Sequence, residues 1–196
     1  MVLSLDPGLV RSTFTPSPSP IDQFSAAQRV ALLEGDVLVM PEVNQGAGAT
    51  VVAYIYVPLS RPQIWPQVTS YHRWTQFFPN IIRSEVLETV KTNSHRYRRL
   101  YQVGRKGFLA LTAQVEIYLR VFETTCDRIQ FCLEQGTFSH FNASLHLQDL
   151  HQGTLLSYSV QAAPTIPIPS FLVEQAMKTD LPSNMRQMRR ILCKEA

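Results

Sequence analysis

Histidine side chains can bind metals or act as acids and bases, and three of them cluster in one stretch of this sequence. His140, His146 and His151 lie within a short segment that has the composition of a strand followed by a turn. His140 and His146 would share one face of that strand, but at ~3.3 Å per residue they would lie roughly 20 Å apart. One metal ion cannot bridge that distance unless the strand bends sharply. We therefore interpret these histidines as members of a polar strand face, and His72 as a surface residue.

The sequence carries no recognised catalytic signature. It contains no GxSxG, HExxH, P-loop or GxGxxG pattern. Glu116 and Glu134 have the spacing of solvated strand residues, so we do not pair them as acid and base. The three cysteines, Cys126, Cys132 and Cys193, form no CxxC motif and indicate reduced structural thiols. We expect no catalytic residue, no metal site and no cofactor.

Arg99 is the charged residue that we predict to face the protein interior. It shares a strand face with Tyr101, and there it could anchor the anionic or carbonyl head of a ligand; the alternative is a strand-end arginine that reaches solvent. The hairpin around it is basic and contains Arg96, Arg98, Arg99, Arg105 and Lys106. We interpret this hairpin as solvated. The alternative is a membrane or partner surface, since each basic residue near an anionic bilayer adds about 1 kcal/mol of binding.

Composition limits the class of protein. The chain has 196 residues, 45% of them hydrophobic and 17% charged, with a formal net charge of +3. This is enough for one domain with a substantial core, and the charge is too small and dispersed for nucleic-acid binding. No apolar run approaches the ~20 residues of a membrane span, and the first residues lack the basic region of a secretory signal. We expect a cytoplasmic protein, with peripheral membrane contact left open.

The N-terminal part has a different character from the rest. Residues 12–20 read STFTPSPSP, which predicts an extended, flexible segment over residues 1–20. A capping box at Ser25 and Gln28, with Gly35 as the C-cap, predicts a short helix over residues 22–33. Residues 36–42 predict a short extra strand. We assign residues 1–47 to an N-terminal arm and residues 48–196 to a ligand-binding domain.

The elements of this domain follow from the alternation of apolar residues and from turn residues. Residues 49–57 form a strand by composition, and Pro66 and Pro79 break the next stretch into two short helices. Six further strands are predicted over residues 82–91, 95–104, 109–123, 127–135, 139–149 and 153–162. In the third of these, residues 111, 113, 115, 117 and 119 are apolar and alternate with polar residues. Period two with one polar face predicts an antiparallel sheet that is covered on one side.

The last element is a long helix over residues 171–193. Its apolar stripe comprises Val173, Met177, Leu181, Met185, Met188 and Leu192. Pro182 has no N–H to donate, so we expect it to kink or restart the helix. One antiparallel sheet with a long helix across it is an α+β domain of two layers.

Three stretches in this order resemble the START-like superfamily, and most closely its polyketide cyclase/dehydrase and coenzyme-Q-binding branch. They are IWPQVTSY at residues 64–71 followed by Phe78 and Pro79, GTLLSYSV at residues 153–160, and residues 166–192. The resemblance spans about residues 49–193, and the arm is similar to that of cyanobacterial and plastid members. It implies a helix-grip fold, with a seven-stranded curved sheet around the C-terminal helix and an apolar ligand cavity between them. In the penultimate strand Ala143 and Leu145 replace the glycine and tryptophan of many members, which puts the cavity shape in doubt there.

From the resemblance and the strand faces together, we predict the residues that line the cavity. They are Trp74, Phe78, Arg99, Tyr101, Val115, Phe131, Phe141, Tyr158, Met177, Leu181 and Met185. The aromatic residues of the short helices, Trp65, Trp74, Phe77 and Phe78, form either a packing cluster or a lid. The methionines of the long helix suit a cavity wall and a filled core equally.

The family hosts several functions, so membership alone does not select one. We expect a non-catalytic binding or carrier protein for a hydrophobic small molecule such as a lipid, an isoprenoid quinone or a pigment. The first alternative is an aromatase/cyclase-type enzyme, which needs a polar pair in the cavity. The second is a protein-interaction or assembly factor that uses the basic hairpin and has a closed cavity. Peripheral membranes and proteins remain further candidate partners.

Overall fold

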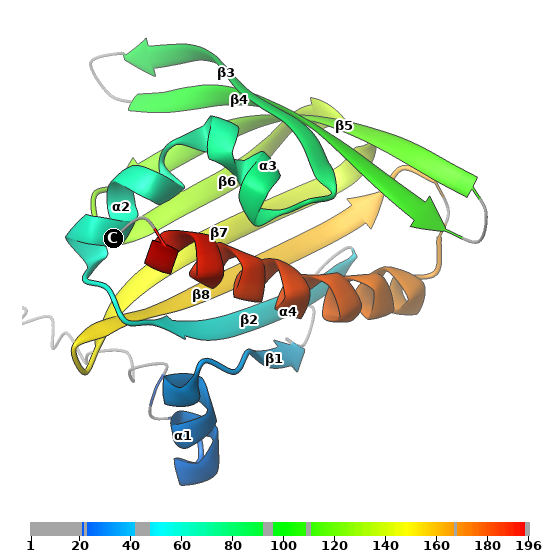
Figure 1. The fold of residues 1–196 in the computed structure, drawn as a ribbon. Helices are drawn as coiled ribbons and strands as arrows, with labels where there is room; N and C mark the ends of the chain where they lie inside the picture. Colours follow the sequence, from blue (N-terminus) through cyan, green and yellow to red (C-terminus); the bar gives the residue numbers. More distant parts are fainter. Residues whose placement is uncertain are drawn as a thin grey trace, which may run out of the picture.

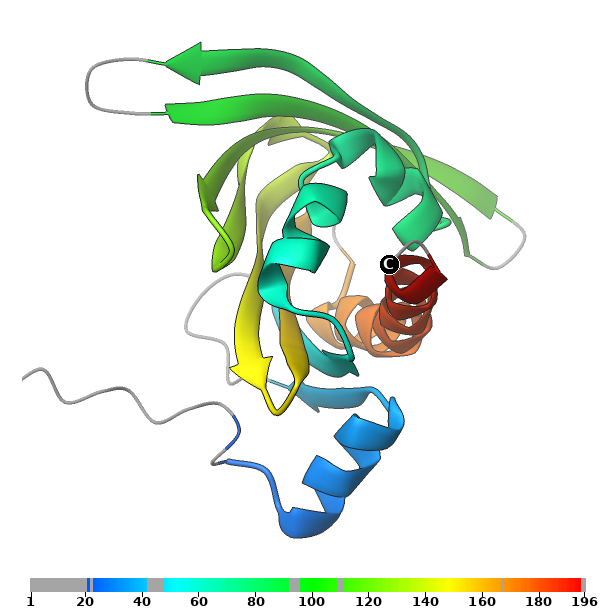
Figure 2. The same cartoon turned by 60° about the vertical axis from the view of Figure 1, so that its left-hand side comes forward.

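One strongly curved antiparallel sheet forms the body of the molecule, and a long helix lies in its concave side (Figures 1 and 2). The computed structural model describes residues 21, 23–41, 48–91, 96–108, 111–166 and 168–194. The strands are β1 Leu38–Pro41, β2 Ala49–Val57, β3 Ile81–Lys91, β4 Arg96–Phe108, β5 Leu111–Thr124, β6 Arg128–Gly136, β7 Phe138–Leu150 and β8 Gly153–Pro164. The helices are α1 Ala26–Glu34, α2 Arg61–Val68, the 3-10 turn η1 Tyr71–Arg73, α3 Trp74–Phe77 and α4 Ser170–Lys194. The predicted flexible segment, residues 1–20, lies outside the described residues.

The strand order across the sheet is β1-β2-β8-β7-β6-β5-β4-β3, so the sheet has eight strands. The expected number, seven, was wrong, because β1 joins the sheet by pairing with β2, with Leu38 opposite Tyr54. The first long strand therefore lies between β1 and β8 rather than at an edge. From β3 to β8, neighbouring strands in the sheet are also neighbours in sequence, as expected for a meander of hairpins.

The alternation predicted for β5 is confirmed. Ile117, Leu119 and Val121 are buried in the core between the sheet and α4. Tyr118 lies on the other face, where its ring packs against Tyr101 of β4, with the ring centroids 4.8 Å apart. From residue 114 onward, the odd-numbered residues of β5 therefore form the inner, concave face, and the even-numbered residues the outer face.

The outer face of the sheet is also covered where β2 and β8 pair. Phe24 precedes α1 and Leu32 lies within it. Both are buried together with Val52, Tyr54 and Leu155 in a second, smaller cluster. This cover explains why almost every residue of β2 is buried, whichever face it occupies. The predicted capping box at the start of α1 and the left-handed Gly35 at its end are both present.

Helix α4 runs without interruption from Ser170 to Lys194, so, of the two expected effects of Pro182, a kink or a restart, the restart was wrong. A proline removes one hydrogen bond from a helix interior but does not end the helix when packing holds both sides. Here Leu181 and Met185, on either side of the proline, are both buried against the sheet. Near its C-terminus, Arg189 Nε donates to the carbonyl oxygen of Tyr56 at 2.9 Å and fixes the helix to β2.

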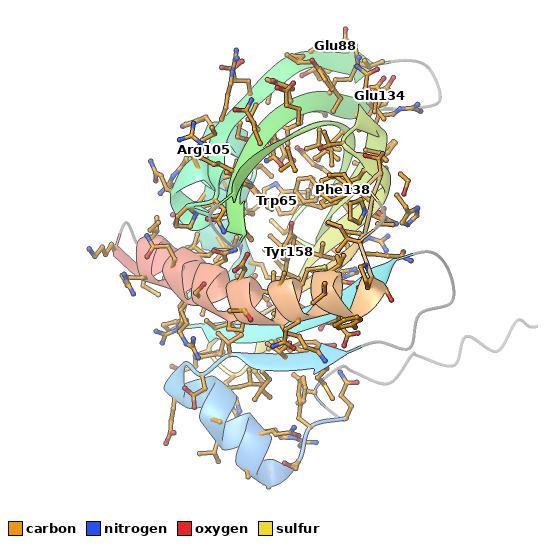
Figure 3. All side chains as sticks on the ribbon, turned by 90° about the vertical axis from the view of Figure 1, so that its right-hand side faces the viewer. Trp65, Glu88, Arg105, Glu134, Phe138 and Tyr158 are labelled. Carbon is orange, nitrogen blue, oxygen red and sulfur yellow. The ribbon has the colours of Figure 1, made fainter. Side chains whose placement is uncertain are left out.

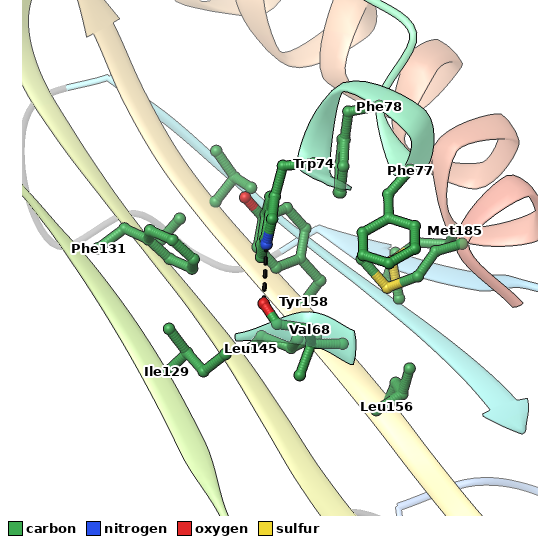
Figure 4. Packing of buried hydrophobic residues seen from close by; sticks show 14 of the residues in the cluster. Val68, Trp74, Phe77, Phe78, Ile129, Phe131, Leu145, Leu156, Tyr158 and Met185 are labelled. Carbon is green, nitrogen blue, oxygen red and sulfur yellow. Dashed lines mark hydrogen bonds between the residues drawn. The ribbon is translucent and has the colours of Figure 1, made fainter. Parts of the chain in front are cut away.

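The short helices α2, η1 and α3 close one end of the concave side (Figure 1). Trp74 is buried and its indole Nε1 donates to the carbonyl oxygen of Val68 at 2.9 Å, as Figure 4 shows. The ring of Phe78 stacks on Trp74 with the centroids 5.2 Å apart, and Phe131 contacts it edge-on at 4.8 Å. Of the two interpretations of these aromatic residues, the geometry favours the packing cluster, with Phe78 reaching beyond it.

Candidate functional site

A cavity of about 300 Å³ lies between the inner face of the sheet and the first half of α4. Strands β4, β5, β7 and β8, the start of β3, the loop after α3 and one side of α4 contribute to its wall. The lining residues are Phe78, Asn80, Ile81, Gln102, Gly104, Arg105, Val115, Ile117, Phe138, Phe141, Tyr158, Val160, Ala162, Val173, Ala176, Met177, Asp180, Leu181 and Asn184. In Figure 3, Phe138 and Tyr158 lie inside the curve of the sheet, above α4. Its size is at the lower end of the range for small-molecule sites.

The polar lining residues differ in their burial. Asn80 and Arg105 are exposed, and Asp180 and Asn184 are partly exposed, so these four belong to the rim of the cavity. Across the rim, Asn80 Nδ2 donates to Asp180 Oδ2 at 3.4 Å and links the loop after α3 to α4. Gln102, by contrast, is buried. The interior wall is thus apolar, apart from one amide and the hydroxyl of a tyrosine.

Six of the eleven residues predicted for the cavity line it: Phe78, Val115, Phe141, Tyr158, Met177 and Leu181. Three others, Trp74, Phe131 and Met185, are buried in the adjoining core, where they support the wall without reaching the cavity (Figure 4). For the methionines, the structure therefore gives both outcomes, since Met177 lines the cavity and Met185 fills the core.

The inward position predicted for Arg99 and Tyr101 was wrong. Arg99 makes ion pairs with Glu88 and Glu134, each at 2.8 Å, and both carboxylates lie outside the curve of the sheet in Figure 3. Tyr101 packs on the outer face against Tyr118. The two residues do share a face, as expected, but it is the outer one. The pattern of β4 was ambiguous because large side chains occupy both of its faces.

Arg98, one position away, points inward instead. Its Nε lies 3.3 Å from Glu123 Oε1, and its guanidinium lies 5.4 Å from the ring centroid of Tyr71. The Tyr71 hydroxyl donates to the same Glu123 oxygen at 2.6 Å. Burial, together with this hydrogen bond, raises the pKa of Tyr71. The charged residues of the inner face thus neutralise each other near η1, outside the lining of the cavity.

The basic residues of the predicted hairpin differ in their exposure and in their partners. Arg96 and Arg105 are exposed, and Arg105 contributes to the cavity rim. Arg98 is paired with Glu123, and the side chain of Lys106 lies outside the described residues. A membrane or partner surface on this hairpin remains a prediction.

The histidines and glutamates considered for metal binding or acid–base chemistry lie apart from one another. Within the described ranges, no three His, Cys, Asp or Glu side chains come together in a way that could hold a metal ion. His140 Nε2 lies 3.1 Å from Gln161 Oε1. His146 is half-buried, and burial, with a smaller contribution from Arg128, lowers its pKa. Glu134 is bound to Arg99 on the outer face.

Large apolar side chains are exposed beside the cavity, on the segment that leads into α4 and in the first turn of this helix. Ile166 is 64% exposed, Ile168 44% and Phe171 65%. Val173, two residues further on, lines the cavity. Exposed apolar residues in a group mark contact sites for apolar partners more often than scattered ones do. In the described part of the chain, no helix is both long and apolar enough to cross a membrane.

Sequence reasoning missed several lining residues, of which Gln102 is the most informative. It lies two residues from the buried Leu100 on β4, so it has the parity of the inner face. Had Leu100 been used to fix the faces of this strand in place of Arg99, Gln102 would have been found. Gly104 continues the same face.

A curved antiparallel sheet around a long C-terminal helix, with an apolar cavity between them, defines the helix-grip class of START-like proteins. The sequence profile described as "polyketide cyclase / dehydrase and lipid transport" matches residues 57–189, more than half of the chain. The chain belongs to this family. A comparison with curated proteins found no match.

Solved structures with the same fold are similar to this chain at low identity. A START superfamily protein from Mycobacterium smegmatis is 17% identical with a TM-score of 0.62, over 75% of this chain and 99% of that one. A STAR-related lipid transfer protein from Xanthomonas axonopodis is 14% identical with a TM-score of 0.58, over 80% and 93%. The Zhui aromatase/cyclase from Streptomyces sp. R1128 is 11% identical with a TM-score of 0.57, over 76% and 93%. These similarities establish the fold. The fold supports hydrophobic ligand binding and does not distinguish a carrier from an enzyme.

Proposed function

We propose that this protein binds and carries a hydrophobic small molecule in the cavity between the sheet and α4, without catalysing a reaction. The observation that carries the proposal is the distribution of polar groups around the cavity. The charged lining residues, Arg105 and Asp180, belong to the partly exposed rim. The interior is lined by residues such as Ile117, Phe138 and Val160, which suit an apolar ligand.

The alternative of an aromatase/cyclase-type enzyme requires a group that exchanges protons within the cavity. Tyr158 is the titratable side chain of the buried wall, and burial raises its pKa. A general base works best when its pKa is near the working pH, so a tyrosine shifted upward is poorly suited to that role. This argument favours binding over catalysis. The alternative of an assembly factor with a closed cavity is disfavoured by the cavity itself.

The exposed apolar residues around the start of α4 support a carrier in particular. A ligand that leaves a membrane must cross little water, and Ile168 and Phe171 offer an apolar surface next to the rim. This peripheral contact with a bilayer is part of the proposal. The exposed Arg105 at the rim would add attraction to anionic lipids.

The test combines an extraction with a blocked cavity. The purified protein is extracted with organic solvent and the extract analysed by mass spectrometry, and the protein is then titrated with the neutral fluorophore N-phenyl-1-naphthylamine. In Ala176→Trp an indole occupies the cavity, whereas Gln175→Trp places the same group on the exposed neighbouring position of α4. We expect the first variant to lose binding at least tenfold and the second to match the wild type. Circular dichroism verifies that both variants are folded.

Absence of any co-purifying apolar molecule, together with no binding of the fluorophore by the wild type, would overturn the proposal. Equal binding by Ala176→Trp and the wild type would show that the fluorophore binds elsewhere, and would also count against this cavity. Turnover of an extracted molecule to a new product would favour the enzyme.

A further inference from the structure

The side chain of Gln102 has a hydrogen-bond acceptor to which no described residue donates, and its neighbours determine which atom that is. Ser84 Oγ lies 2.6 Å from the carbonyl oxygen of Tyr71 and 3.1 Å from Gln102 Nε2. The carbonyl can only accept, so the single proton of Ser84 goes to Tyr71, and Ser84 must accept from Gln102. The amide is therefore oriented with Nε2 toward Ser84 and Oε1 away from it.

The Oε1 atom faces the cavity. Gln102 lines the cavity and is only 7% exposed. Among the described residues, none donates a hydrogen bond to Oε1. Gln102 is also not one of the described residues whose side chain has a fully enclosed atom without a partner, so Oε1 borders open space. The open space beside it is the cavity, and the amide thus presents an acceptor inside a largely apolar wall.

Tyr158 presents a second polar atom to the same cavity. It lies on β8, which is separated from β4 in the sheet by β7, β6 and β5, and it is also 7% exposed. Its ring is held by Trp74 and Phe78, with centroids at 5.9 and 5.4 Å. Within the described part of the chain its hydroxyl has no hydrogen-bond partner. Burial raises its pKa, so the hydroxyl stays protonated near neutral pH and can donate.

We propose that the cavity selects a ligand whose polar end is an uncharged hydroxyl, an alcohol or phenol, which donates to Gln102 Oε1, and that Tyr158 donates to an oxygen of the same ligand. This inference rests on the proposed function and names the chemical class of its ligand. A hydroxyl is the smallest group that both donates and accepts, which matches the acceptor of Gln102 and the donor of Tyr158.

Two other ligand classes fit this wall less well. A carboxylate would need a buried cation, but Arg98 is paired with Glu123 and Arg105 is exposed at the rim. A buried charge without a partner is strongly disfavoured. A ketone or quinone can only accept, so it would satisfy Tyr158 and leave the Gln102 acceptor without a donor, which weakens binding.

Three probes of equal chain length separate these classes: 1-decanol, methyl decyl ether and decanoate, each measured by displacement of N-phenyl-1-naphthylamine at pH 8. The ether keeps the acceptor oxygen and lacks the donor. Gln102→Met removes the amide at similar volume and leaves the bond from Ser84 to Tyr71 intact, whereas Gln130→Met makes the same change on the outer face of β6. Tyr158→Phe has a matched control in Tyr101→Phe on the outer face.

In Gln102→Met we expect the affinity for decanol, relative to that for the ether, to fall about tenfold, the size expected for one buried hydrogen bond. Tyr158→Phe should weaken decanol and the ether alike, by about fivefold, because both have an oxygen that accepts. Gln130→Met and Tyr101→Phe should change neither affinity. Decanoate should bind the wild type at least tenfold more weakly than decanol.

An unchanged decanol-to-ether ratio in Gln102→Met would overturn the role of Gln102, and unchanged affinities in Tyr158→Phe would overturn that of Tyr158. Tighter binding of decanoate than of decanol would overturn the uncharged head group. Each of these results leaves the carrier function standing. Failure of all three probes and of the fluorophore to bind the wild type would instead overturn the proposed function.

Discussion

The hydroxyl of Tyr71 should contribute measurably to stability, although it lies outside the cavity. Tyr71→Phe removes the hydrogen bond to Glu123 Oε1, which is 2.6 Å long, and keeps the ring contacts with Phe131 and with the guanidinium of Arg98. Hydrogen bonds to charged groups contribute about 1.5–3 kcal/mol. Glu123 is 21% exposed and retains Arg98 at 3.3 Å, so we expect the lower end of this range. A loss of about 1.5 kcal/mol corresponds to roughly a tenfold change in the unfolding equilibrium.

Guanidinium chloride unfolding, followed by circular dichroism, measures this loss as a lower midpoint at unchanged slope. The matched control is Tyr97→Phe, which removes an outer-face hydroxyl that no described residue hydrogen-bonds, keeps the ring contact with Phe122 and should leave the midpoint in place. A double-mutant cycle with Glu123→Ala isolates the pair, and the coupling energy should be about 1 kcal/mol or more. If Tyr71→Phe unfolds within 0.5 kcal/mol of the wild type, or if the coupling is zero, this description of the inner-face charges is wrong.

Three further predictions concern the core, the pH dependence and the membrane contact. Trp74→Phe removes the indole N–H that donates to the carbonyl oxygen of Val68 and should lower the free energy of unfolding by about 2 kcal/mol in the same denaturant assay. An unchanged free energy of unfolding would contradict the burial of this carbonyl. Burial lowers the pKa of His146 in the folded protein below its ordinary value of 6.5, so the unfolded chain binds the proton more readily. The contribution of His146 to the free energy of unfolding is therefore complete above pH 6.5 and is lost as the pH falls below it. Unfolding midpoints from pH 8 to 5 should therefore decline more steeply for the wild type than for His146→Asn, and parallel curves would refute this. Replacing both Ile168 and Phe171 by serine should reduce sedimentation with phosphatidylcholine and phosphatidylserine vesicles severalfold while leaving decanol binding in solution unchanged; equal sedimentation would exclude this segment as the contact.

Sequence patterns predicted the elements of the fold closely, because local signals were strong. The alternation around Ile117 and Leu119 located β5 and its inner face, and Ser25 with Gln28 located the start of α1. The apolar stripe through Leu181 predicted the long helix, although Pro182 does not restart it. Six of the predicted cavity residues line it, since strand parity and helix spacing were clear at those positions.

The same reasoning failed where both faces of a strand carry large polar residues. In β4 the choice between Arg98 and Arg99 is decided by partners from distant segments: Glu123 for the former, and Glu88 and Glu134 for the latter. Local sequence preference cannot predict which of the two arginines faces inward, because each can form an ion pair with a carboxylate on its own side of the sheet. Which residues of β4 face inward is therefore decided only in the assembled sheet.

The sequence by itself determined the class of this protein: an α+β domain with an antiparallel sheet, a long C-terminal helix and a family resemblance that implied an apolar cavity. Periodicity and turn chemistry act over a few residues, so they can be read along the chain. Only the tertiary structure decided which polar atoms reach that cavity. The bond from Ser84 to Tyr71 orients the amide of Gln102, and Trp74 and Phe78 position the hydroxyl of Tyr158. Both depend on contacts between residues far apart in the sequence, which come together only when the sheet curves around α4.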